Sequence, residues 1–234
     1  MDTNNDRIAF AAVNTRIFRF PEQKLATFGE TKIRYYMVTR PFYEEPVNNN
    51  PETVLRQGFV IAEKPRIVTP YYMSRIDGFS PEARNYFDRI SKLYGANSPG
   101  IYYNYRNQSE DLSIIPDTLE SVVDKLNEDI DDRKEALSAI ILGIDDLWDI
   151  SLLKFIFEIT IDSVDNNLRQ LKSAGLLKTD SSGIPCEARL RIEELFEKLA
   201  LTEISPHVLK KELEYWGLFE LYQDRFFQAL RTSV

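Results

Sequence analysis

The sequence is poor in the residues that build most metal and redox sites. Among 234 residues there is one cysteine, Cys186, and one histidine, His207. A single cysteine excludes an internal disulfide and any zinc site made of several cysteines. Cys186 lies beside a turn signal, where we interpret it as a small structural residue. The sequence therefore predicts no metal ion and no organic cofactor.

Motifs that mark nucleotide loops and nucleophile elbows are also missing. The sequence contains no G-x-G-x-x-G, no G-x-x-x-x-G-K-[ST] and no G-x-S-x-G. A catalytic His–Ser or His–Cys pair would have to use His207, and no sequence motif surrounds this residue. The aspartates in residues 129–132 and 145–149 lack the alternating ligands and central glycine of a calcium loop, so we interpret them as helix caps. We expect a protein that is not an enzyme.

Long hydrophobic runs are absent as well. No apolar stretch approaches the roughly 20 residues that a membrane-spanning helix needs. The first ten residues, MDTNNDRIAF, lack the basic-then-apolar order of a signal peptide. Hydrophobic residues nevertheless make up 43% of the chain, with 14 Phe and 12 Tyr, which is enough for a core. The sequence predicts no membrane segment and a cytoplasmic protein.

Charge is distributed unevenly. Residues 1–115 contain 15 Lys+Arg and 13 Asp+Glu, a net charge of +2. Residues 116–234 contain 14 and 24, a net charge of −10, and together the segments give the overall −8. Because binding to phosphate backbones depends on basic side chains, the acidic segment disfavours specific DNA binding.

The first 115 residues have the pattern of a mostly antiparallel sheet with one helix. Ser80-Pro81-Glu82 predicts the start of that helix, with Gly95 at its end. Alternation from Lys32 to Thr39 places apolar side chains on both faces, which is typical of a central strand. We also expect hairpins around 29–31 and 63–66 and strand structure in six other stretches: Ile8–Phe20, Leu25–Phe28, Phe59–Ala62, Ile67–Thr69, Ile101–Tyr105 and Leu112–Ile115.

Tyrosine and arginine are interleaved in this first part. It holds ten of the twelve tyrosines, as in Arg34-Tyr35-Tyr36 and Tyr102-Tyr103-Asn104-Tyr105-Arg106. Aromatic rings beside arginine on a sheet can stack nucleic-acid bases. Strands also favour tyrosine for ordinary packing. The sequence leaves both interpretations open.

Residues 116–234 have a helical pattern throughout. Asp117 with Glu120 three residues later forms a capping-box arrangement. A second helix is expected over Arg133–Leu142. A short apolar helix is expected after Ser151, interrupted near Thr160-Ile161. The fold class predicted is α+β, with a sheet-rich domain over 1–115 and a helical domain over 116–234.

The stretch Asp162–Leu177, DSVDNNLRQLKSAGLL, is the most informative part of that helical domain. Val164, Leu168 and Leu171 share one helix face, and Gly175 provides the stop. A helix ending in L-x-x-L-x-x-x-G-L-L, followed by the polar turn 178–185 and another helix, resembles the winged-helix superfamily. The resemblance covers residues 133–199 and implies a helix pair followed by a wing.

Turning Val164, Leu168 and Leu171 inward points a polar set outward. These candidate partner-binding residues are Asp162, Asn166, Arg169, Gln170 and Ser173. Our leading hypothesis is a non-enzymatic adaptor or regulatory protein whose helical half binds another protein; a homo-oligomer is compatible with it. The alternative is a nucleic-acid-binding regulator that uses the winged-helix-like segment.

A salt titration distinguishes these two hypotheses. Asp162 and Asp165 offset Arg169 and Lys172, so the segment is neutral. We expect no measurable duplex binding near physiological salt, and only nonspecific binding at low salt that fades steeply as salt rises. The measurement compares wild type with Arg169→Ala on mixed-sequence duplex and single-stranded DNA. Sub-micromolar, sequence-dependent binding that Arg169→Ala abolishes would establish the alternative.

Overall fold

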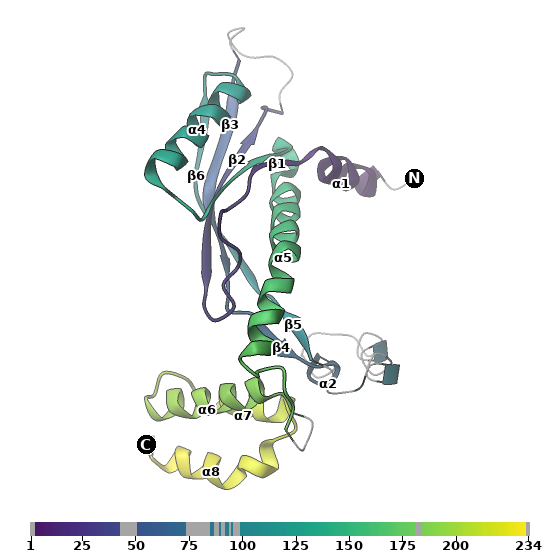
Figure 1. The fold of residues 1–234 in the computed structure, drawn as a ribbon, viewed down its shortest axis with the longest axis vertical. Helices are drawn as coiled ribbons and strands as arrows, with labels where there is room; N and C mark the ends of the chain where they lie inside the picture. Colours follow the sequence, from purple (N-terminus) through teal and green to yellow (C-terminus); the bar gives the residue numbers. More distant parts are fainter. Residues whose placement is uncertain are drawn as a thin grey trace. The chain divides into compact units, whose positions relative to one another are not determined.

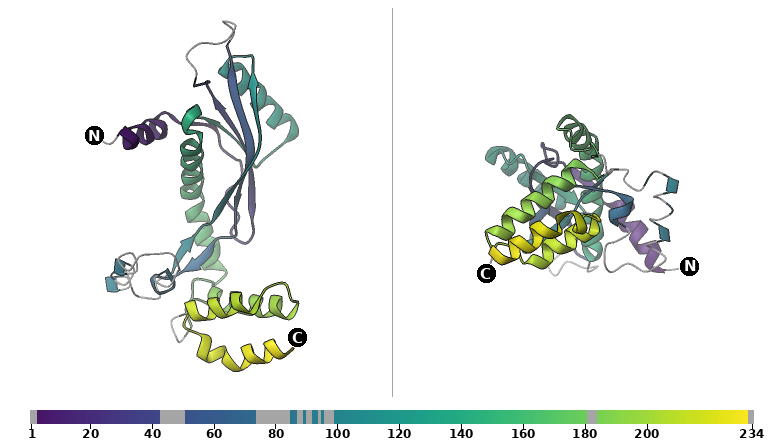
Figure 2. Two further views of the ribbon diagram at one scale, coloured as in Figure 1. Left: turned by 180° about the vertical axis from the view of Figure 1, so that it is seen from behind. Right: turned by 90° about the horizontal axis from the view of Figure 1, so that it is seen from below.

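The computed structural model describes residues 3–42, 51–73, 99–180 and 184–232, together with positions 85, 86, 89, 92, 93 and 95. Two compact units make up the chain (Figures 1 and 2). The first, here the sheet unit, comprises Met1–Pro65 and Tyr103–Asn167. The second, the helical unit, comprises Arg66–Tyr102 and Leu168–Val234. Each unit therefore draws residues from both sides of position 116.

The sheet unit contains a five-stranded mixed sheet in the order β1-β7-β2-β3-β6. β2, β3 and β6 form an antiparallel meander. β7 lies between β1 and β2, antiparallel to the former and parallel to the latter. The elements of this unit are α1 (Thr3–Asn14), β1 (Arg16–Arg19), β2 (Thr31–Thr39), β3 (Thr53–Ala62), β6 (Tyr105–Ile115), α4 (Leu119–Arg133), β7 (Ser138–Leu142), the 3₁₀ turn η1 (Asp145–Leu147) and most of α5 (Trp148–Ser173).

Each face of the sheet is covered by one helix (Figure 1). In β2, Ile33, Tyr35 and Met37 pack in the core under α5, while Tyr36 and Val38 pack in the core under α4. Because successive side chains of a strand point to opposite faces, a strand buried on both sides is apolar at nearly every position. β2 is central in the sheet, as its pattern predicts.

A close approach and a bulge shape the edge of the sheet. A Cβ on Gly58 of β3 would lie 2.5 Å from the carbonyl oxygen of Gln108 and 2.8 Å from the hydroxyl of Tyr35. At this point the register passes from Gln57↔Asp111 to Gly58↔Ser109, so Glu110 is an extra residue in β6. A bulge bends its strand and leaves one residue out of the ladder.

The helical unit has its own core. The elements are β4 (Arg66–Val68), α2 (Pro70–Met73), β5 (Gly100–Tyr102), α6 (Cys186–Ala200), α7 (Pro206–Tyr215), α8 (Phe219–Thr232) and the last turns of α5. β4 and β5 pair antiparallel. Helices α6, α7 and α8 bury a cluster that also includes Val68 and Tyr72. Large buried members of this cluster include Ile192, Leu195, Phe196, Leu199, Leu209, Leu213, Trp216 and Phe226.

A largely buried ion cluster joins β4 to α6 and α7 inside this unit. Oε1 of Glu212, a residue only 8% exposed, accepts hydrogen bonds from Arg66 Nη2 at 2.6 Å and from Arg191 Nε at 3.1 Å. The indole Nε1 of Trp216 donates to the same oxygen at 3.3 Å. A buried carboxylate is costly unless it is paired in this way, so the cluster constrains how these elements pack.

The predicted α+β class is confirmed, but several segments were assigned the wrong element. Residues 8–14 belong to helix α1 rather than to a strand, and β1 begins only at Arg16. Residues 138–142 form β7 inside the sheet, so the expected helix over Arg133–Leu142 is wrong and the segment 116–234 is not entirely helical. The apolar run Ala139–Ile141 is fully buried between two strands, an environment that suits either element until its neighbours are known.

Other expected boundaries also differ. α5 is one continuous helix through Thr160-Ile161, where an interruption was expected. β3 and β4 do not form a hairpin, because β4 pairs with β5 in a separate sheet. Residues 25–28 are not a strand. Most of the helix expected from Ser80 to Gly95 lies outside the described residues.

Gly58 offers a direct test of the edge geometry. Gly58→Ala should lower the free energy of unfolding by at least about 2 kcal/mol, because the new methyl group would overlap backbone that pairing holds in place. Gly29→Ala is the matched control, since a Cβ there meets nothing within 4 Å. Urea unfolding measures both. Equal, small effects would show that the β3–β6 pairing is looser than described.

The start of α4 provides a second test. Hydrogen bonds from the Lys125 ammonium, the Ser121 hydroxyl and the Thr118 N–H lower the pKa of Asp117 from 3.8 to about 2. The stabilisation is therefore present above pH 3.8 and is lost as pH falls through about 2. Wild type should lose stability relative to Asp117→Asn across this window in urea unfolding.

Asp124→Asn on the same helix controls for the loss of one negative charge. A difference between wild type and Asp117→Asn that does not change with pH would contradict the assignment.

Candidate functional site

All five predicted partner-binding residues lie on α5. Arg169, Gln170 and Ser173 are exposed, and Asn166 is half-buried. Asp162 is exposed too, but its carboxylate pairs with the Lys24 ammonium at 3.1 Å. The first two along the chain belong to the sheet unit and the other three to the helical unit. Their role in binding a partner remains a prediction.

The inward face of this part of α5 is not the predicted one. Leu171 is buried, but Val164 and Leu168 are only half-buried. The fully buried positions are instead Ser163 and Asn167, both 0% exposed. The helix is therefore rotated relative to the expected orientation, and it places polar side chains against the core.

Those polar side chains are fully satisfied within the sheet unit. Ser163 Oγ accepts from the Leu25 N–H at 3.1 Å and donates to the Ile159 carbonyl at 2.7 Å. The amide of Asn167 contacts the hydroxyls of Thr27 and Tyr103, each at 3.1 Å, and in the orientation that satisfies every group its nitrogen donates to the Leu25 carbonyl at 3.0 Å. The bonds anchor the segment around Leu25 to α5, because buried polar groups are costly when unpaired.

The opposite side of α5 exposes large apolar side chains. Leu153, Phe157 and Ile161 recur every four residues and are 60%, 64% and 58% exposed. We call these three the outer stripe. The core-facing residues of the same turns are Leu152, Phe155 and Ile159. A helix with an apolar stripe on both sides is normally covered on both sides.

Further apolar side chains are exposed elsewhere on the sheet unit. In α1, Phe10 and Val13 are 57% and 80% exposed, although Ala11 between them is buried. On the edge strand β6, Leu112 and Ile114 are 57% and 54% exposed. Single exposed apolar residues are ordinary, and an interaction surface requires a contiguous patch.

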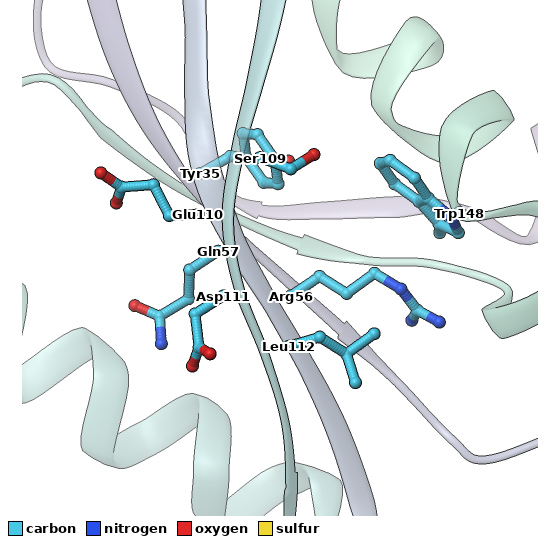
Figure 3. Close-up of a pocket in the computed structure, with 8 residues that line it drawn as sticks. All are labelled: Tyr35, Arg56, Gln57, Ser109, Glu110, Asp111, Leu112 and Trp148. Carbon is cyan, nitrogen blue, oxygen red and sulfur yellow. The ribbon is translucent and has the colours of Figure 1, made fainter.

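A cavity of about 360 Å³ opens between the sheet and the start of α5 (Figure 3). It lies at the β6 bulge and is within the size range of small-molecule sites. Eight residues line it: Tyr35, Arg56, Gln57, Ser109, Glu110, Asp111, Leu112 and Trp148.

The cation of this cavity is already compensated. Arg56 Nη1 donates to Asp145 Oδ1 at 2.6 Å, and the guanidinium lies 5.8 Å from the ring centroid of Trp148. Asp145 also accepts from the Thr39 hydroxyl at 2.9 Å and from the Phe42 N–H at 3.2 Å. The predicted cap role of this aspartate is therefore wrong: Asp145 is the first residue of η1, where no side chain makes a cap hydrogen bond, and its carboxylate holds Arg56 in position.

Of the eight described tyrosines among the first 115 residues, three are buried, three are half-buried and two, Tyr86 and Tyr102, are exposed. Tyr35, Tyr36 and Tyr72 are at most 5% exposed. Burial raises the pKa of the Tyr103 and Tyr105 hydroxyls, which bond to side chains on α5. Rings that are packed in this way are not available to stack bases.

The remaining chemical candidates stay isolated. His207 is exposed in the first turn of α7, and Cys186 is half-buried at the first residue of α6. Within the described ranges, no three His, Cys, Asp or Glu side chains come together as a metal site. In the same part of the chain, no helix is both long and apolar enough to cross a membrane.

Comparison with known proteins adds no assignment. No family model matches the chain, and neither the curated proteins nor the solved structures include a match. The winged-helix resemblance of residues 133–199 is therefore unsupported by any relative, and that segment contributes β7 to the sheet unit and α6 to the helical unit.

Proposed function

We propose that the protein is a non-enzymatic adaptor or regulatory protein that binds another protein through the outer face of α5. The observation that carries this proposal is the outer stripe, Leu153, Phe157 and Ile161, each more than half exposed. All three lie within residues 116–234, the part of the sequence in which partner binding was expected. The polar set around Arg169 is now secondary to this apolar surface.

The exposed side chains of the outer stripe lack the stabilisation that burial would give them. Burying one large aliphatic or aromatic side chain is worth about 1.5–3 kcal/mol. Three such side chains held in water on one helix face leave several kcal/mol available to a partner. A partner helix with its own apolar face fits this surface, since helix faces present anchors at i, i+4 and i+8.

The charge around α5 supports a protein partner over nucleic acid. Asp162 and Asp165 accompany Arg169 and Lys172 on this helix, and Asp162 holds Lys24 in an ion pair. Phosphate binding needs a surplus of basic side chains, and none accompanies the outer stripe. A nucleic-acid regulator remains the alternative that the salt titration tests.

Site-specific photo-cross-linking tests the proposal. The native cells express the protein with a benzophenone amino acid at position 157. This group should give discrete protein adducts, because the side chain at this position would lie within the interface. The same group at Glu128, an exposed position on α4, should give none. Phe157→Ser should release the captured protein but hardly change the melting temperature, because this side chain is 64% exposed. Equal labelling from both positions, or none from 157, would contradict the proposal.

A further inference from the structure

We propose that the cavity beside Trp148 binds a neutral, flat heteroaromatic ring of nucleobase size that accepts hydrogen bonds. This site is distinct from the outer stripe, and the inference does not depend on the protein-binding function. It rests on the shape of the cavity walls, the direction of their polar groups and the balance of charge around Arg56.

The walls are formed by side chains from one face of the sheet. Figure 3 shows Tyr35, Ser109, Arg56 and Leu112 directed to the side of the sheet on which Trp148 lies. The alternation of the strands accounts for this, because Arg56 pairs with Leu112 and Gly58 with Ser109, and Tyr35 packs in the core under α5. An indole, a leucine and a phenol ring give the cavity mainly apolar walls, which suit a flat ring.

Three polar side chains, two of them acidic, are directed away from the cavity. Gln57, Glu110 and Asp111 point away from Trp148 in Figure 3, so their backbone rather than their side chains borders it. Glu110 instead pairs with Arg34 at 3.3 Å. The cavity therefore contains no carboxylate free to bind a cationic ligand.

The polar side chains that remain are hydrogen-bond donors. Among the described residues, both hydrogen bonds of the Arg56 guanidinium come from Nη1, to Asp145 and Thr39, which leaves Nε and Nη2 for a ligand acceptor. The hydroxyl of Ser109 accepts weakly from Asn107 Nδ2 at 3.5 Å and keeps its own proton to donate. Two donors beside apolar walls select a ring that carries acceptor nitrogens or carbonyls.

Charge balance excludes an anion as the preferred ligand. Asp145 lies 2.6 Å from Arg56 and compensates its charge. Both side chains are largely buried, at 17% and 16% exposure. A ligand carboxylate or phosphate would bring a second negative charge to a single guanidinium, and its desolvation would go uncompensated. A neutral ring incurs no such cost.

The β6 bulge keeps the cavity in place before any ligand arrives. Its extra residue, Glu110, has no partner in the β3 ladder, and a side chain at Gly58 would collide with the strand at this point. A rigid, preformed site loses little entropy on binding. The bulge is therefore interpreted as a feature that shapes the cavity floor.

The test is a titration of adenosine followed by the indole N–H resonances. The two tryptophans report separately, because Trp148 lines the cavity and Trp216 is buried in the helical unit. Adenosine should shift the Trp148 resonance with a Kd at or below about 1 mM and leave that of Trp216 unchanged. Ser109→Leu, which fills the cavity from an exposed strand, should weaken binding at least tenfold.

Matched controls separate this ligand class from others. Gln57→Leu changes a neighbouring side chain that points away from the cavity and should leave the affinity unchanged. Benzoate tests for an anion, and N-acetyltryptophanamide tests for an aromatic anchor of a protein partner; both should bind at least tenfold more weakly than adenosine. The proposal is overturned if adenosine, uridine and nicotinamide all leave Trp148 unshifted, if either comparison probe binds as tightly, or if Gln57→Leu matches the effect of Ser109→Leu.

Discussion

The sheet unit depends on one long-range pairing, that of β2 with β7. Five residues, 34–38, lie in parallel register with residues 138–142, which follow about 100 positions later in the chain. Without β7, the central strand β2 would be an open edge, β1 would have no partner, and Ile140 and Ile141 would have no core to enter. The start of α5 follows directly from β7, so this pairing also sets where the cavity forms.

The parts of the fold that could be predicted from sequence are those with local causes. The alternation of β2 predicted a strand buried on both faces because the strand period is expressed within nine residues. The start of α4 was predicted from Asp117 and Glu120 to within two residues, but the predicted cap is off by one position: the N-cap is Thr118, whose hydroxyl accepts from the Ser121 N–H. β7 could not be recognised in the same way, because its short run of buried apolar residues fits a helix as well as a strand, and only β1 and β2 determine which one forms.

The candidate site shows the same division between local and distant causes. The spacing of Leu153, Phe157 and Ile161 is visible in the sequence, but Leu152, Phe155 and Ile159 give the same stretch a second apolar face. Which of the two stripes meets water depends on the sheet. The cavity could not be predicted from the sequence, because Arg56 and Trp148 come together only when β3, β6 and α5 have assembled.

The edge strand β6 has a consequence for solubility. It is eleven residues long, and in the described part of the chain no strand pairs with its outer side. Strands of other copies can pair with such an edge and extend the sheet into fibres. Here the six residues Arg106–Asp111 are all polar, three of them charged, and the bulge at Glu110 twists the strand out of the flat geometry that stacking requires. The bulge at Glu110 thus makes this long edge a poorer template for the addition of further strands.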